Sequence, residues 1–332
     1  MNQSMCSAME QLSSSAILKS ALIFTIINCS ILIPMVLRAS YSLWFSKTGG
    51  LFHKNLRIII QFHLLGFLIH SSARVFLHSL DLFNYLFLSP CDMIPSVWRC
   101  FWLRFIYAIG LWITSTTVIP LIFERWAATK FSGKYEKSGV IPAIGLVVVQ
   151  CFFCAVHLQI LYSGSVIEGV QMPYCMVARD SKVNVGEING WLTIGVQLIG
   201  RAAFEYLYRE NKIQNLRKAQ LQSSLSNRFQ LEQNLLVMDI LKMFANISSV
   251  YLFMHAFTFM GVLKLKNFVS MPVYFALVEI NSSYPIYGLI SILLMLHLLR
   301  KNRQKVHDKL AIHVNSKWEG DEKNFGTRYF VS

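Results

Sequence analysis

The stretch CFWLRFIYAIGLWITSTTVIPLIFER, residues 100–125, decides the fold of this chain. Between Cys100 and Phe123 it holds a single charged residue, Arg104, and it ends on the pair Glu124-Arg125. At about 1.5 Å per helical residue, Cys100 and Arg125 lie roughly 37 Å apart, which is enough to cross the hydrocarbon core of a bilayer. The stretch therefore predicts a transmembrane helix with Cys100 at one membrane surface and Glu124-Arg125 at the other.

The composition of the whole chain is typical of a membrane protein. Of its 332 residues, 54% are hydrophobic and only 14% are charged, whereas soluble domains typically carry about 25% charged residues. The net charge of +14 would suggest nucleic acid as the partner of a soluble protein, but here the basic residues lie between apolar runs. We therefore expect a lipid bilayer and no nucleic acid as partner. No metal-ligand spacing occurs, so no cofactor is expected.

Seven apolar runs are long enough to span a bilayer, which takes about 20 mainly apolar residues. The fifth is short and contains Arg201 and Glu205. We predict an all-α membrane protein, with a seven-transmembrane helix bundle over residues 1–300 and a cytoplasmic tail over 301–332. The predicted spans cover residues 16–37, 58–80, 100–123, 139–162, 191–208, 235–262 and 272–299.

The distribution of Lys and Arg predicts the direction of the chain. The loops and tail on one side of the predicted spans hold 21 of these residues, and the segments on the other side hold 5. Because basic residues accumulate on the cytoplasmic side, the N-terminus is expected outside and the C-terminus inside. Asn2 begins an Asn-Gln-Ser sequon on the outer side and is a candidate glycosylation site.

Ionisable residues inside the predicted spans are candidate functional residues, because a charge within the bilayer needs a partner or water. Four residues of span 58–80 lie within about 80° of one another on the helix surface: His63, His70, Arg74 and His78. Two interpretations stay open: a ligand pocket or water-filled network near the outer end, or hydrogen bonds between helices that serve stability alone. A metal site is not expected, because each pair spaced by four includes Arg74.

Depth in the membrane predicts a partner for Arg74. It lies about 9 Å below the outer end of the second span, and Glu279 lies about 10 Å below the outer end of the seventh. These two spans are neighbours in a receptor-like ring, so we expect Arg74 and Glu279 to pair. Arg104, about 6 Å below the top of the third span, is in a position to join them.

Cysteines on the outer side predict a disulfide that ties the second outer loop to the bundle. Cys175 lies in this loop, and the oxidising exterior permits a bond to Cys100 at the top of the third span. Cys91 competes for the same partner. Cys100 is favoured because its distance to Arg125 suits the top of a helix.

The plan of the chain resembles that of rhodopsin-like G-protein-coupled receptors, in which an acidic residue and an Arg end the third span and a Cys begins it. Glu124, Arg125 and Cys100 fit these places. The resemblance implies that Glu124 holds Arg125 in the resting state and that Arg125 is released to meet the G protein. The seventh span departs from the pattern, because Pro285 is followed by Tyr287 rather than by a Pro-x-x-Tyr spacing.

Longer stretches resemble a narrower family, the class AB serpentine chemoreceptors of nematodes. The resemblance implies a receptor that binds a small environmental or pheromone-like ligand and activates a heterotrimeric G protein, in the plasma membrane of sensory neurons or of their cilia. The stretches that carry it are FHKNLRIIIQFH (52–63), DLFNYLFLSPCDMIPSVWRCFWLRFIY (81–107), ERWAATKFSGKYE (124–136), SSLSNRFQLEQNL (223–235) and EINSSYPIYGLIS (279–291).

Other function classes fit the residues less well. A multi-pass transporter or channel is the alternative, but no inverted repeat, paired broken helices or filter-like loop is evident. An enzyme is not expected, because no nucleophile–base pair and no cluster of metal ligands is visible. A retinal pigment would need a Lys in the last span, and residues 272–299 have none.

Overall fold

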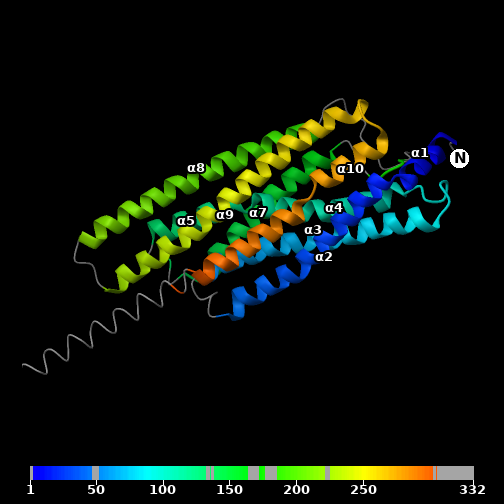
Figure 1. The fold of residues 1–332 in the computed structure, drawn as a ribbon. Helices are drawn as coiled ribbons and strands as arrows, with labels where there is room; N and C mark the ends of the chain where they lie inside the picture. The colour runs from blue at the N-terminus through cyan, green and yellow to red at the C-terminus, as the bar shows by residue number, and fades with distance from the viewer. Residues whose placement is uncertain are drawn as a thin grey trace, which may run out of the picture.

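A computed structural model of the chain describes residues 3–46, 52–131, 135, 138–163, 172–175, 185–220, 225–301 and 304. Every regular element in these ranges is a helix, and the long helices lie side by side in one elongated bundle (Figure 1). The helices are α1 (Gln3–Ser14), α2 (Ala16–Phe45), α3 (Lys54–Phe87), α4 (Val97–Thr116), α5 (Val118–Lys130), α7 (Ile141–Tyr162), α8 (Val185–Gln220), α9 (Leu225–Lys264), a short 3-10 helix (Leu265–Asn267), α10 (Met271–Asn281) and a last helix over residues 284–301.

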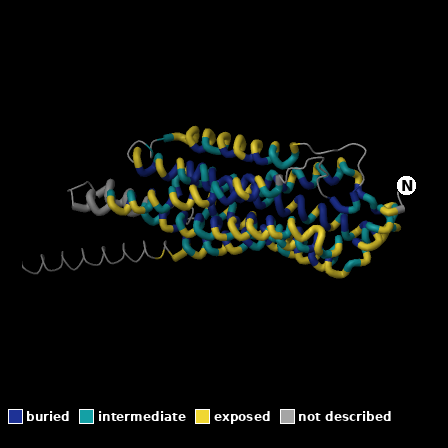
Figure 2. The backbone as a smooth tube through the Cα atoms, turned by 90° about the horizontal axis from the view of Figure 1, so that it is seen from above, coloured by how far each residue is buried: buried dark blue, intermediate teal, exposed yellow. Residues whose placement is uncertain are grey.

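Apolar and charged side chains are distributed in the bundle as in a protein embedded in lipid. Its outer faces are exposed and its buried residues lie between the helices (Figure 2). Large apolar side chains such as Phe152 are 65% exposed, while Arg74 is only 1% exposed. Water does not favour such an arrangement over so large a surface, but hydrocarbon does. The all-helical membrane fold predicted from the sequence is confirmed.

Six helical segments of the described chain are long and apolar enough to cross a membrane. They are Ala16–Phe45, Lys54–Phe87, Val97–Lys130, Ile141–Tyr162, Leu235–Asn267 and Met271–Lys301. The predicted span 191–208 lies within α8, which runs alongside α9 (Figure 1). Polar residues such as Arg201 and Glu205 lower the apolarity of α8, so it is not one of the six.

The helices extend past several predicted span ends. α3 continues seven residues beyond residue 80, to Phe87, so Arg74 lies farther from the end of its helix than the sequence predicted. α8 and α9 also reach beyond residues 191–208 and 235–262. A helix does not stop where its apolar run stops, because polar residues continue the backbone hydrogen bonds outside the hydrocarbon. The domain limits at residues 300 and 301 stay predictions.

The third predicted span consists of two helices, α4 and α5, which meet at Thr117. The hydroxyl of Thr116 donates to the Trp112 carbonyl at 2.6 Å, and that of Thr117 to the Ile113 carbonyl at 2.8 Å. Hydroxyl bonds of this kind bend helices, and Pro120 has no N–H to donate to the preceding turn. The span is therefore interrupted in its middle.

The last predicted span is interrupted as well, between α10 and the helix over 284–301. Pro285 has no N–H, so the carbonyl of Asn281 loses the donor that a regular helix would supply. The N–H of Ile286 reaches the Ser283 carbonyl, at 3.1 Å, and the Ser282 carbonyl accepts instead from the N–H of Tyr284, at 2.7 Å. A carbonyl oxygen can accept two hydrogen bonds, so this break leaves acceptor positions on Asn281 and Ser282 for side chains of other helices.

Two disulfides lie at the same end of the bundle, which we call the disulfide end. One joins Cys100 at the start of α4 to Cys175, and the other joins Cys6 of α1 to Cys91, just after α3. The structure thus has the expected bond between Cys100 and Cys175. Cys91 is not the competitor that the sequence suggested, because α1 folds back over the bundle and brings Cys6 to it. The N-terminal segment carried too little pattern to predict this contact.

The backbones of α3 and α4 touch where Gly66 meets Gly110. A Cβ atom added to Gly110 would lie 2.5 Å from the Gly66 carbonyl oxygen and 2.6 Å from the His70 nitrogen. Both of these atoms belong to backbone and cannot swing away. Small residues allow such close approach between helices in membranes, and here it brings the polar faces of α3 and α4 together.

We expect Gly110→Ala to destabilise the protein, because the added methyl group pushes α4 away from α3. Overpacking of this kind typically costs about 1–3 kcal/mol. Thermal unfolding of purified protein in detergent measures the effect. Gly145→Ala on α7 is the matched control, since no atom lies within 4 Å of an added Cβ there. Equal melting temperatures for the two variants would contradict the close contact.

Candidate functional site

The first polar centre lies towards the disulfide end, around the carboxylate of Glu279 on α10. Arg74 of α3 donates to Glu279 Oε2 and to the Ser282 carbonyl at the helix break. Arg104 of α4 donates from Nη2 to Glu279 Oε1 at 2.9 Å. The expected contact between Arg74 and Glu279 is thus present, with Arg104 joined to it. The Glu279 side chain is only 2% exposed, so one buried carboxylate faces two guanidinium groups.

Tyr174 and His78 complete this arrangement, which we call the Glu279 centre. The Tyr174 hydroxyl donates to Glu279 Oε1 at 2.8 Å. His78 Nε2 accepts from Arg74 Nε at 3.2 Å and lies 3.3 Å from Glu279 Oε2. Burial, and then the Glu279 carboxylate, raise the pKa of Tyr174 well above its ordinary value, so its hydroxyl keeps the proton that it donates. Sequence reasoning missed Tyr174; its position beside Cys175 was the one signal.

His70 approaches the Glu279 centre through Tyr107. His70 Nδ1 lies 3.1 Å from the Tyr107 carbonyl oxygen, and the two rings meet edge to face. The Tyr107 hydroxyl accepts from Arg104 Nη1 at 2.6 Å. The guanidinium carbons of Arg74 and Arg104 lie 5.8 and 5.5 Å from the centre of the Tyr107 ring, within the range of cation–π attraction. The ring of Tyr107, on α4, therefore contacts the guanidinium groups of both arginines.

A second polar cluster lies in the middle of the bundle, where α4 gives way to α5. Gln150 of α7 donates to the Ile113 carbonyl at 2.6 Å and to Thr117 Oγ1 at 2.9 Å. Gln197 of α8 donates to the Ser115 carbonyl at 2.9 Å. The break in the third span is thus held by side chains of two other helices. Nothing in the spacing of Gln150 or Gln197 had singled them out.

Two more helices reach the same cluster, which we call the threonine cluster. The Tyr284 hydroxyl, just after the break in the last span, donates to Thr114 Oγ1. His63 of α3 places Nδ1 3.0 Å from Thr117 Oγ1. His63 belongs to the polar face predicted on α3, but it lies in this cluster and not in the Glu279 centre. The polar face of α3 therefore serves two separate sites.

The third polar centre is the pair Glu124-Arg125, at the opposite end of the bundle from the disulfides. Arg125 donates through both Nε and Nη2 to the Glu124 carboxylate, and the Tyr135 hydroxyl donates to the same group. Glu124 and Arg125 are 1% and 3% exposed. Burial, and then the Glu124 carboxylate, raise the pKa of Tyr135 above its ordinary value. Tyr135 therefore stays protonated and keeps its hydrogen bond.

Asn2, the candidate glycosylation site, lies outside the described residues. Within the described ranges, no three His, Cys, Asp or Glu side chains gather in a way that could hold a metal ion.

The fold and these three polar centres define a multi-pass helical membrane protein whose buried charges connect broken helices. Such an interior is typical of membrane receptors and transporters. Residues 3–330 match the family model described as serpentine type 7TM GPCR receptor class ab chemoreceptor. The chain belongs to this family, which is a seven-transmembrane receptor family and not an enzyme family. The family resemblance noted from the sequence is confirmed. No curated protein matches the chain.

We expect Glu279→Gln to reduce the stability of the protein strongly, because it leaves Arg74 and Arg104 buried without a carboxylate. Removing one partner of a buried ion pair typically costs about 3–5 kcal/mol. Thermal unfolding and the amount of receptor at the cell surface measure the effect. Glu205→Gln is the control, since its contacts to Arg209 and Lys242 are partly exposed and weak pairs of that kind contribute little. A melting temperature equal to that of the unchanged protein would show that the Glu279 centre is dispensable.

Proposed function

We propose that this chain is a chemosensory receptor that binds a small environmental or pheromone-like ligand and activates a heterotrimeric G protein. Membership of the class AB family supports the chemoreceptor role. The observation that carries the proposal is the closed Glu124–Arg125 pair, buried at the end of the bundle away from the disulfides. A buried guanidinium held by the neighbouring carboxylate is a switch that a conformational change can open.

The pair is held by more than its own attraction. Tyr135, eleven residues further along the chain, adds a hydrogen bond to Glu124, and Asn211 of α8 donates to Thr129 Oγ1 at 2.7 Å, one turn after Arg125. In the proposed resting state, these contacts keep Arg125 inside the bundle. In the active state, movement of α8 and α9 away from α5 exposes Arg125 to the G protein. A ligand shifts the equilibrium between the two states by binding one of them more tightly.

The Glu279 centre is the candidate site at which ligand binding acts. His70, Arg74, His78, Arg104 and Glu279 are the candidate residues of the ligand pocket or interior network. They lie near the disulfide end, and Arg74 contacts the break in the last span through the Ser282 carbonyl. A ligand that competes for either guanidinium changes the angle at this break, and Tyr284 transmits the change to the threonine cluster.

The proposed topology has the N-terminus outside and the C-terminus in the cytoplasm. Disulfides form in oxidising compartments, and both disulfides lie at one end of the bundle. The loops and tail on the opposite side contain most of the Lys and Arg residues, as cytoplasmic segments do. We place the receptor in the plasma membrane of sensory neurons or of their cilia, with the tail over 301–332 facing the G protein.

We expect Glu124→Gln to raise signalling in the absence of ligand, and Arg125→Ala to abolish signalling. A charge-assisted hydrogen bond contributes about 1.5–3 kcal/mol, so its loss shifts the ratio of open to closed receptor by roughly tenfold or more. A G-protein reporter in cells, normalised to receptor at the surface, measures both effects. Because the effect concerns basal output, the experiment needs no identified ligand.

Controls separate the switch from general damage and from the alternative function. Glu205→Gln removes an acidic residue from a partly exposed position and should leave basal output unchanged. A Glu124→Gln variant that reaches the surface with unaltered output would contradict the switch. Ligand-dependent current in cells without G proteins would instead favour a channel.

We expect protease added to sealed, right-side-out vesicles to spare the tail over 301–332 and to cut the outer segment near Cys175. The reason is the proposed topology, which shields the tail behind the membrane. Antibodies against terminal tags detect the fragments. Digestion of the tail before the vesicles are permeabilised would reverse the topology.

A further inference from the structure

Helix α1 lies at the disulfide end of the bundle, where it packs against α3 and α10 (Figure 1). One side of it is buried: Met9 and Leu12 are 1% and 0% exposed. These two side chains belong to one apolar cluster with Tyr174 and Phe275. Tyr174 stacks on Phe275, with 4.3 Å between the ring centres, and donates to Glu279. α1 therefore covers the layer of side chains that closes the Glu279 centre.

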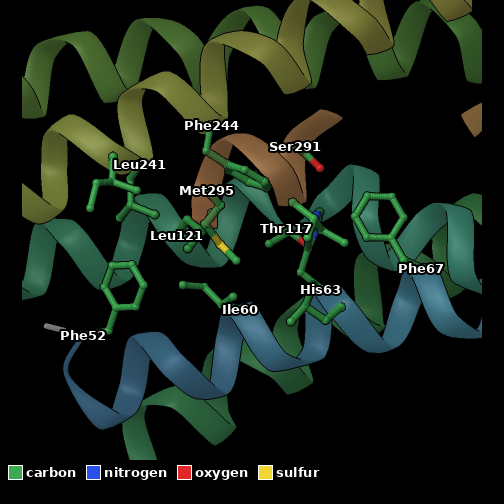
Figure 3. A pocket seen from close by; sticks show the side chains of 13 residues that line it. Phe52, Ile60, His63, Phe67, Thr117, Leu121, Leu241, Phe244, Ser291 and Met295 are labelled. Carbon is green, nitrogen blue, oxygen red and sulfur yellow. The ribbon is translucent and has the colours of Figure 1, made fainter. Parts of the chain in front are cut away.

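The middle of the bundle is closely packed. The apolar cavity lined by His63, Phe244 and Met295 has a volume of about 20 Å³ (Figure 3), which is room for about one water molecule. Towards the disulfide end, the Glu279 side chain is only 2% exposed. A ligand that reaches Glu279 from this end must therefore displace side chains that cover it, and α1 is part of that cover.

α1 is attached to the bundle by its buried apolar side and by one covalent bond, the disulfide from Cys6 to Cys91. The hydroxyls of Ser7, Ser13 and Ser14 donate to carbonyls within α1 itself. A helix of 12 residues is only marginally stable in water without packing against other elements. Loss of the disulfide therefore weakens both the position of α1 and its helical structure.

A single residue, Ser15, separates α1 from α2. Its backbone is extended, with φ −71° and ψ 114°. Its hydroxyl accepts from the Leu18 N–H at 3.3 Å and so caps the start of α2. Because this cap belongs to α2, the chain can turn at Ser15 while α2 keeps its first turn. Ser15 is thus a hinge for α1.

The two disulfides differ in their access to water. Cys100 and Cys175 are 1% and 2% exposed, so a water-soluble reductant cannot easily reach their sulfurs. Cys6 and Cys91 are partly exposed. Thiol–disulfide exchange needs direct attack on a sulfur atom, so the accessible bond reacts first. A reductant can therefore release α1 while the segment with Tyr174 stays tied to α4.

We propose that the Cys6–Cys91 disulfide is a redox latch that a water-soluble dithiol opens, which frees α1 to turn at Ser15 and uncovers the disulfide end above the Glu279 centre. A thiolate of the dithiol attacks one sulfur of this bond and forms a mixed disulfide, while the other sulfur leaves and takes up a proton. The second thiol of the reductant then closes a cyclic disulfide and releases the remaining sulfur as a thiol. Two electrons thus pass from the dithiol to Cys6 and Cys91.

The latch stands on the geometry of α1 and of the two disulfides. Its control of ligand entry rests on the role proposed above for the Glu279 centre.

Stepwise reduction of the full-length protein in lipid nanodiscs tests the difference between the two bonds. The free thiols of the chain are blocked first, the protein is titrated with dithiothreitol, and mass spectrometry locates the newly alkylated cysteines. We expect Cys6 and Cys91 to be alkylated at dithiothreitol concentrations roughly tenfold below those that open the Cys100–Cys175 bond. Opening of both bonds at the same concentration would overturn the latch.

Hydrogen–deuterium exchange of the same samples measures the release of α1. We expect the amides of residues 3–14 to exchange roughly tenfold faster once Cys6 and Cys91 are reduced, because the freed helix is marginally stable. Amides of α10, which α1 contacts, should also exchange faster, and those of α5 at the opposite end should not change. Unaltered protection of α1 after reduction would contradict the proposal.

Variants separate the disulfide from the packing of α1. Cys6→Ser combined with Cys91→Ser should give the fast exchange without any reductant, and dithiothreitol at the low concentration should then add nothing. With the disulfide intact, Leu12→Ala should speed the exchange of α1, whereas Gln11→Ala, at an exposed neighbouring position, should not. Slow exchange in the double variant would show that the disulfide does not hold α1 in place.

The titration of the unchanged protein decides the question even if the double variant does not fold. None of these measurements involves a G protein. Absence of signalling would therefore contradict the proposed function and leave the latch unaffected.

Discussion

The carboxylate of Glu279 is the constraint on which the arrangement of the disulfide end depends. It is buried in a bundle surrounded by hydrocarbon, where an uncompensated charge is very costly. Its compensation comes from Arg74 on α3, Arg104 on α4 and the Tyr174 hydroxyl. Three parts of the chain must therefore converge on one side chain of α10. The disulfide from Cys100 to Cys175 supports the same convergence, because it holds the segment with Tyr174 against the top of α4.

The two breaks in the helices matter as much as the charges. Pro285 frees the carbonyl of Asn281, which accepts from His255 Nδ1 at 3.0 Å. The Ser282 carbonyl beside it accepts from Arg74 as well as from the Tyr284 N–H. The carbonyls around the other break accept from Gln150 and Gln197. In hydrocarbon a freed carbonyl must find a donor within the protein, so each break fixes the positions of neighbouring helices. Tyr284 links the breaks, since it follows one and donates to Thr114 at the other. The bundle thus has a continuous polar path through its interior, from the disulfide end to its middle.

Several of these features followed from residue type and depth. The contact between Arg74 and Glu279 was predictable because a charge inside a span needs a partner and both residues lay at similar depth. The Cys100–Cys175 bond was predictable from the length of the third span. Tyr174, Tyr135 and Cys6 were not predictable, because each reaches its partner through the path of a loop or a terminal helix. Gln150 and Gln197 were missed for a different reason: a single amide in an apolar run has no meaning until the helix rotation and the carbonyl opposite are known.

The sequence by itself determined that the chain is a membrane-embedded helical bundle of the serpentine receptor family, and that it buries a small number of charges. Hydropathy, helix length and family motifs are local properties of the chain, so they need no knowledge of the packing. Only the tertiary structure decided which polar group meets which. Hydrogen bonds form over about 3 Å, and a bend at Thr117 or Pro285 moves side chains by more than that distance. The break at Pro285 also gave Arg74 its second acceptor, the Ser282 carbonyl, which accepts from both Arg74 and the Tyr284 N–H.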